Sequence, residues 1–328
     1  MKHIRILLSL LLIISTTFFP ENAEEDYFFE RSITGATGWA CCDLELRQEA
    51  DPHSEPVSVI AQGESFCIIE EEQDFWKIAY GNRLYYIDHN YCLINLPDVL
   101  PSVQYNITNA YSSIFRSSYQ NIPGLTGAKL YQFGRRYNYR LEREEFAAPM
   151  LYSTAKMVAK AQYLARQQGY TLKIYDTYRP HSVTAFAADR LREFYRSNGS
   201  IRHNIDYDST GSYWGQSWYL AQGTSAHNTG SALDVTLVSL ETGEEITMAS
   251  PMHELSTVSL KGRGDLLNDI FTEAGMTGIA SEWWHFQDNA GNHRIKARTG
   301  AMDFQIRSIN SIREDQVYYY MYSGCFDR

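Results

Sequence analysis

The chain has 328 residues and a mass of 37.7 kDa, which is enough for about two domains. Apolar residues make up 44% and charged residues 21%, which excludes a largely disordered chain and a membrane protein with many spans. The net charge of −10 gives no electrostatic attraction for nucleic acid, so we expect no nucleic-acid partner.

The first residues have the pattern of an export signal. A basic start is followed by an apolar run over 6–19, Pro20 and a small residue, Ala23. We therefore assign 1–23 to a secretory signal peptide, although Glu21 stands where a second small residue is typical. The alternative is an uncleaved membrane anchor, for which the run is short. We expect a secreted protein that has no membrane contact after cleavage.

Four cysteines lie in the N-terminal part of the exported chain, and the fifth is near the C-terminus. They are Cys41, Cys42, Cys67, Cys92 and Cys325. Export predicts one or two disulfides among the first four, with the pairing left open. No CxxC motif and no Cys/His cluster is present, so we do not expect these cysteines to bind metal.

The segment 24–98 alternates short apolar runs with turn residues, which predicts a small all-β domain, either a barrel or a sandwich. The expected strands are 44–47, 57–60, 65–70, 75–80 and 84–87. The sequences Leu-Glu-Leu-Arg and Asp-Phe-Trp-Lys-Ile-Ala-Tyr resemble those of bacterial SH3-like domains. That resemblance implies binding to cell-wall peptides or glycan; the alternative is a spacer.

The two prolines in 96–101 suggest a linker, after which 99–328 forms a second domain. Helical spacing of apolar residues or good caps predict helices over 153–168, 181–198 and 265–274. Strands are expected at 171–175 and 231–238, with a turn at 241–244, and the Tyr-rich tail 317–322 is expected to be a packed strand. Because helices and strands do not alternate regularly, the predicted class is α+β.

Three polar clusters in the second domain contain side chains that can bind a metal or take part in catalysis. Tyr-Asp-Thr-Tyr-Arg-Pro places Arg179 between a strand and a helix, where its planar charge can stabilise a carboxylate or an oxyanion. Ser-Ala-His-Asn-Thr-Gly-Ser-Ala-Leu-Asp contains His227 and Asp234, and Ser-Glu-Trp-Trp-His contains Glu282 and His285. Each cluster alone is also compatible with a purely structural role. Together they predict metal-assisted hydrolysis of an acyl or amide bond.

In order and spacing, these three motifs resemble those of D-alanyl-D-alanine dipeptidases and related zinc D,D-carboxypeptidases over about residues 100–290. The resemblance implies an α+β zinc peptidase with an antiparallel sheet and flanking helices. It assigns His227, Asp234 and His285 as ligands of one Zn²⁺. A zinc-bound water would attack the peptide carbonyl, with Glu282 as the base and Arg179 stabilising the oxyanion. The substrates would be D-Ala-D-Ala or the stem peptides of peptidoglycan, in the cell envelope of a bacterium.

The same resemblance places Asp176, and Thr224 or Ser225, in the substrate pocket. His253 stands where the dipeptidase pattern has an aspartate that holds the substrate's amino group, and Glu254 is next to it. A free ammonium favours an anionic partner, so this change argues against strict selectivity for the free dipeptide. The export signal and the SH3-like domain favour trimming of wall peptides outside the membrane, and dipeptidase and carboxypeptidase both remain open. Two alternatives remain: an L,D-carboxypeptidase acting on tetrapeptide stems, and a wall-binding or signalling protein with a structural zinc.

Overall fold

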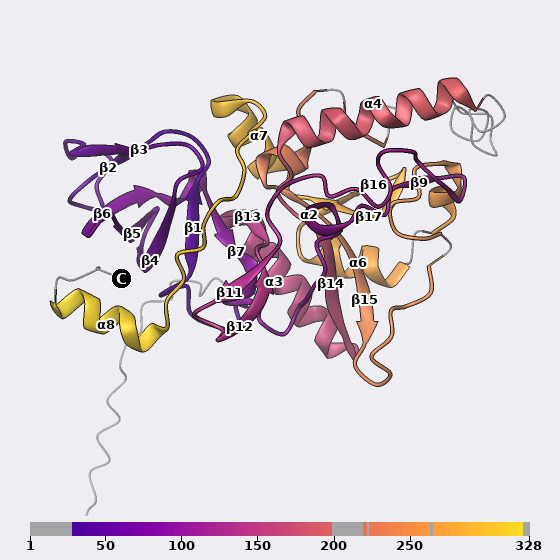
Figure 1. Cartoon of the computed structure of the whole chain (residues 1–328). Helices are drawn as coiled ribbons and strands as arrows, with labels where there is room; N and C mark the ends of the chain where they lie inside the picture. Colours follow the sequence, from indigo (N-terminus) through magenta and orange to yellow (C-terminus); the bar gives the residue numbers. More distant parts are fainter. Residues whose placement is uncertain (1–27, 199–218, 222, 249, 263–264, 324–328) are drawn as a thin grey trace, which may run out of the picture.

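The computed structural model describes residues 28–198, 219–221, 223–248, 250–262 and 265–323. Two large sheets, three two-stranded sheets and several helices pack around one large core, which confirms the α+β class (Figure 1). The predicted signal peptide lies outside the described residues. Within the described residues, no helix is both long enough and apolar enough to cross a membrane.

The N-terminal sheet has the strand order β13-β7-β1-β4-β5-β6, and all its neighbours are antiparallel. Phe66 and Trp76 are buried in contact on one face, since alternate residues of a strand reach the same face, whereas Trp39, which pairs with Ser65, is buried on the other face. The five strands expected in this part of the chain are all present. The elements are β1 (Thr37–Ala40), β2 (Leu44–Leu46), β3 (Ser58–Ile60), β4 (Ser65–Glu72), β5 (Phe75–Tyr80), β6 (Arg83–Asp88), η1 (His89–Tyr91) and β7 (Cys92–Asn95).

The segment interpreted as a linker is instead a buried turn of helix, α1 (Leu96–Val99). Its Asp98 accepts hydrogen bonds from the Thr37 amide (2.9 Å) and the Asn138 side chain (2.6 Å), so it is held on both sides. The linker interpretation failed because prolines also occur in the first turn of a helix, where they cost no hydrogen bond. The domain boundary at residue 98 stays a prediction.

The chain crosses between the two sheets more than once. β13 (Pro149–Leu151), from the predicted second domain 99–328, pairs with β7 at the edge of the N-terminal sheet. After α7 (Asn289–Thr299), the chain runs back across the N-terminal sheet, where Asn310 bonds Ser65 and Thr37, and then forms α8 (Glu314–Ser323) (Figure 1). The strand expected at 317–322 was wrong. Tyrosine favours strands only weakly, and two acids in the first turn favour the N-terminus of a helix.

The second sheet has the order β16-β17-β15-β14-β8. Its pairs are antiparallel except for β8 with β14, which is parallel, so the expectation of an antiparallel sheet holds for the other pairs. The register aligns Asp176 of β14 with Asp234 of β15, and Asp234 with His285 of β17. Three polar residues from distant parts of the chain therefore lie in one row across the middle of the sheet.

The three predicted helices form close to their expected ends, and α3 packs on β14 and β7. The remaining elements are β8 (Gln104–Tyr105), α2 (Thr108–Tyr111), β9 (Arg116–Ser117), β10 (Gln120–Asn121), β11 (Arg135–Asn138), β12 (Arg143–Phe146), α3 (Tyr152–Gln167), β14 (Tyr170–Asp176), α4 (His181–Ser197), η3 (Ala226–Thr229), β15 (Ala232–Ser239), η4 (Thr257–Gly262), α6 (Asp265–Glu273), β16 (Thr277–Ile279) and β17 (Glu282–Gln287).

Cys41, Cys42 and Cys92 are free thiols, so the disulfides expected among the first four cysteines are not formed. Burial raises the pKa of Cys41 and Cys92 well above the usual thiol value, which keeps both thiols protonated and unreactive. Cys325 lies outside the described residues. The sequence could not distinguish buried hydrophobic cysteines from paired ones, because both types are common in a core.

Candidate metal centre

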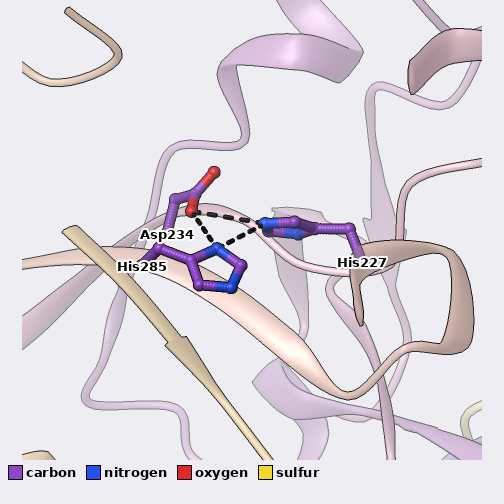
Figure 2. Close-up of side chains that lie close together, drawn as sticks. All are labelled: His227, Asp234 and His285. Atoms are coloured by element: carbon purple, nitrogen blue, oxygen red, sulfur yellow. Dashed lines mark hydrogen bonds and ion pairs between the residues drawn. The ribbon is translucent and has the colours of Figure 1, made fainter. Parts of the chain in front are cut away.

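Three side chains meet where η3, β15 and β17 come together (Figure 2). His227 Nε2 lies 3.1 Å from His285 Nδ1, and each of these nitrogens lies 3.3 Å from Asp234 Oδ1. All three residues are buried. These are the three residues that the sequence predicted as ligands, and the structure brings them together.

The donor atoms fit a tetrahedral metal. Two donors at about 2.0 Å from a tetrahedral zinc are roughly 3.3 Å apart, close to the separations of 3.1–3.3 Å found here. Two imidazoles and one carboxylate are a donor set typical of catalytic zinc, since three protein ligands leave a fourth position for water or substrate. The residues present therefore fit one zinc ion.

Each imidazole is oriented by a second contact on its outer nitrogen. His227 Nδ1 is 2.8 Å from the carbonyl oxygen of Thr177, and His285 Nε2 is 3.1 Å from Oε1 of Gln287. Because both oxygens only accept, these nitrogens carry the hydrogens and the inner nitrogens are left to bind metal. The sequence analysis missed Thr177 and Gln287. For Gln287 a signal existed, since it lies two residues after His285 on the same strand.

A capped turn of 3₁₀ helix places His227. Ser225 Oγ accepts a hydrogen bond from the His227 amide at 3.2 Å, and Asn228 Oδ1 accepts one from the Ser225 amide at 2.9 Å. Gly230 then ends the turn with a φ of +70°, a backbone region that favours glycine. The structure thus places Ser225 in the cap and the half-buried Thr224 just before it, while their contact with substrate stays a prediction.

The charges at the centre are strongly coupled. Burial alone would raise the pKa of Asp234, but the imidazoles of His227, His253 and His285 outweigh it and hold the pKa well below its usual range. Burial opposes protonation of His285, yet its contact with Asp234 raises the pKa of this imidazole above its usual value. A carboxylate that stays ionised in a buried site is ready to bind a cation.

Glu282 lies beside the three donors on β17. Its Oε2 accepts a hydrogen bond from Trp284 Nε1 at 3.1 Å and lies 3.9 Å from His285 Nδ1. The residue is 6% exposed, and burial raises its pKa to about 8 against the opposing effects of His285, Arg179 and Trp284. A register shift between β16 and β17 accompanies this placement. Such irregularities redirect side chains beside functional sites.

Arg179 follows β14 and is held on two sides. Its Nη1 donates to Asp176 Oδ2 at 2.8 Å, its Nε donates to Thr184 Oγ1 at 3.1 Å, and its guanidinium lies over the Phe115 ring. The Arg179 amide also donates to the carbonyl of His227 at 3.1 Å, which ties it to the metal-binding turn. Arg179 is thus an oriented cation next to the centre, and its predicted contact with an oxyanion stays a prediction.

Asp176 is fully buried and already has several donors. Besides Arg179, its carboxylate accepts from the Asn109 side chain, from the Tyr131 hydroxyl at 3.2 Å and from the Thr177 amide at 3.1 Å. These contacts indicate that it orients Arg179, whereas the sequence placed it in the substrate pocket. Its contact with substrate stays a prediction.

The segment before η4 places the His253 side chain next to the proposed metal ligand Asp234. His253 is fully buried, and its Nε2 lies 3.1 Å from Asp234 Oδ2. The neighbouring Glu254 points to a different loop, where it accepts hydrogen bonds from the Tyr119 amide and the Ser256 hydroxyl. The sequence had assigned His253 to substrate binding, and its contact with Asp234 could not be read from sequence spacing.

Comparisons with known proteins agree with this geometry. Residues 150–301 match the family model Peptidase_M15, described as D-ala-D-ala dipeptidase, and this range contains every residue of the candidate centre. The D-alanyl-D-alanine dipeptidase of Enterococcus faecium is 33% identical over 147 residues, covering 41% of this chain and 70% of that protein. The enzyme of Enterococcus faecalis is 31% identical over 153 residues with the same coverage.

A solved structure, "VanYB in complex with D-Alanine-D-Alanine", is similar at 13% identity and a TM-score of 0.29, over 64% of this chain and 92% of that one. At this level the similarity adds nothing to the assignment. The two enterococcal relatives and the matching family model carry it, and the chain belongs to the D-alanyl-D-alanine dipeptidase family of peptidases.

Proposed function

We propose that this chain is a secreted zinc D,D-peptidase of the bacterial cell wall, which removes D-alanine from the ends of peptidoglycan stem peptides. The observation that carries the proposal is the triangle of donors formed by His227, Asp234 and His285, with Glu282 and Arg179 beside it. A structural metal site needs neither a buried carboxyl of raised pKa nor an oriented arginine. This arrangement therefore favours catalysis over the alternative of a structural zinc.

The side chains divide the work of amide hydrolysis. A zinc held by His227, Asp234 and His285 would supply Lewis acidity, to polarise the scissile carbonyl and lower the pKa of water. Glu282 takes the proton from the attacking water and passes it to the leaving amine of D-alanine. Arg179, fixed by Asp176 and Thr184, stabilises the negative oxygen that develops on the carbonyl carbon.

The carboxylates around the centre favour a peptide over the free dipeptide. Free D-Ala-D-Ala carries an ammonium group, which favours an anionic partner. Among the described residues, Asp176, Asp234 and Glu254 are each engaged by internal donors, and Glu282 is the proposed base. A stem peptide has an amide in place of that ammonium and needs no such anion. We therefore place pentapeptide stems ahead of the free dipeptide as substrate.

The N-terminal sheet is proposed to bind the cell wall next to the catalytic site. Its direct pairing with β13 and the shared core support this, because wall bound by the sheet stays in a fixed position relative to the centre. The test is co-sedimentation of the full chain carrying E282Q with purified peptidoglycan, in the presence of excess soluble pentapeptide stem to block the active site. Loss of sedimentation under these conditions assigns wall binding to the active site instead.

The catalytic proposal is tested on the purified mature chain. Zinc content is measured, and released D-alanine is assayed with a pentapeptide stem, a tetrapeptide stem and free D-Ala-D-Ala. We expect one zinc per chain, the highest kcat/KM on the pentapeptide, and loss of activity on chelation that added zinc restores.

The alternatives give different results in the same experiment. A chain that holds zinc but hydrolyses none of the three compounds is the structural-zinc protein. Preference for the tetrapeptide identifies an L,D-carboxypeptidase, and preference for the free dipeptide contradicts the argument from the engaged carboxylates.

A further inference from the structure

His253 is held in an unusual backbone conformation by a neighbouring strand. Its φ is +59°, which is costly for any residue other than glycine and persists only where the surroundings enforce it. The surroundings here are β9: the Arg116 amide donates to the His253 carbonyl at 3.0 Å, and the Leu255 amide donates to the Arg116 carbonyl at 2.7 Å. The Tyr195 hydroxyl also donates to the Leu255 carbonyl. The fold thus fixes the place from which the imidazole extends.

The imidazole is surrounded by aromatic rings. The centroid of the Phe115 ring lies 4.6 Å away and that of Trp284 5.8 Å, with Tyr175 at 6.5 Å. Within the described part of the chain, Nδ1 has no hydrogen-bond partner, and Nε2 reaches Asp234 Oδ2. Because a carboxylate only accepts, Nε2 carries the hydrogen in this contact. Among the described residues, the one hydrogen bond of the imidazole is therefore with a proposed metal ligand.

The two oxygens of Asp234 face different partners. Oδ1 lies 3.3 Å from the inner nitrogens of both His227 and His285, whereas Oδ2 lies 3.1 Å from His253 on the other side. A carboxylate can bind a metal through one oxygen or through both. With both oxygens bound, Asp234 would occupy the coordination position that water or substrate needs.

We propose that His253 is a positioning residue: by holding Oδ2, it makes Asp234 a one-oxygen ligand and keeps a coordination position open for the reaction. The inference rests on the proposed zinc peptidase function and extends it to a residue that contacts a metal ligand. His253 is fully buried and acts through Asp234. This role takes the place of the contact with the substrate's amino group that the sequence suggested.

The test compares three variants of the full chain. H253F keeps a flat ring between Phe115 and Trp284 but removes the donor, and H253Q restores a side-chain N–H near the same place. Y195F is the matched control, because it removes a hydrogen bond to the same segment without affecting a side chain of the centre. For each we measure zinc affinity by competition with a chelator, the visible spectrum after Co²⁺ substitution, and kcat and KM.

We expect H253F to bind zinc about 10–100-fold more weakly, as is typical when an outer partner of a ligand is lost. The Co²⁺ spectrum should weaken, since five-coordinate cobalt absorbs less than tetrahedral cobalt, and kcat should fall with KM nearly unchanged. H253Q should recover part of each loss, and Y195F should match the wild type. Wild-type values for H253F in zinc affinity and cobalt spectrum overturn the proposal.

If H253F does not fold, a structure of the zinc-loaded wild type tests the proposal independently. One Asp234 oxygen on the metal and the other on His253 supports the proposal, and both oxygens on the metal overturns it. Failure of the proposed function itself is distinguishable, because the wild type would then bind no zinc or release no D-alanine.

Discussion

At the scale of single residues, the pKa of Glu282 sets the expected pH dependence. Its pKa is raised from 4.5 to about 8, chiefly by burial, and a cation bound beside it lowers this value again. A base must be ionised, so kcat/KM should fall as pH falls through the pKa of Glu282. We expect this acid limb between 4.5 and about 8 in a pH profile of kcat/KM. A rate that does not change across this interval contradicts the assignment.

Replacing the Glu282 carboxylate tests the same residue at constant pH. E282Q keeps the size of the side chain and can still accept the hydrogen bond from Trp284, but it cannot take a proton. We expect kcat to fall by about 10²–10⁴-fold while zinc content stays that of the wild type. Near-normal turnover by E282Q would show that another group is the base.

Arg179 is expected to depend on the shape of its guanidinium, not only on its charge. Its contacts with Asp176 and Thr184 use two different nitrogens, an arrangement that a lysine ammonium cannot reproduce. R179K should therefore lower kcat by about 10²–10³-fold, the typical loss for one oxyanion donor. R192K is the control, since Arg192 pairs only with the exposed Asp189 among the described residues and should keep full activity.

At the scale of elements, Gly230 joins the turn carrying His227 to the strand carrying Asp234. A Cβ at this position would lie 2.5 Å from Leu93 Cδ2, in a backbone conformation with φ of +70°. We expect G230A to destabilise the fold by about 1–3 kcal/mol, measured by urea unfolding, and to weaken zinc binding.

Gly243 offers a matched control for Gly230. It has a similar φ of +72°, but a Cβ there meets no atom within 4 Å. G243A should therefore cost only the backbone strain and leave zinc affinity unchanged. Equal effects of the two variants would mean that the close contact with Leu93 contributes nothing.

At the scale of the whole molecule, the shared core predicts that both sheets unfold together. β13 lies in the N-terminal sheet yet leads directly into α3, and Met150 of this strand is fully buried opposite Ile94. M150A should cost about 2–5 kcal/mol and lower the midpoint of a single calorimetric transition. M157A, at a half-buried position, is the control and should cost less. Two separate transitions would indicate independently stable units.

Much of the candidate site could be predicted from the sequence because its residues lie in short motifs. The motif with His227 and Asp234 and the motif with Glu282 and His285 each combine donor types and spacings that suit a metal site. The helices over 153–168, 181–198 and 265–274 were equally predictable, since apolar periodicity and caps are local properties.

The sequence by itself determined the chemistry: which side chains can bind zinc, take a proton or stabilise an oxyanion. Only the tertiary structure decided the partners of those side chains, such as Thr177 for His227 and His253 for Asp234. It also decided that β13 and the C-terminal segment complete the N-terminal sheet. The physical reason is that these contacts join residues far apart in the chain, and hydrophobic burial and strand register, which select them, leave no local pattern in the sequence.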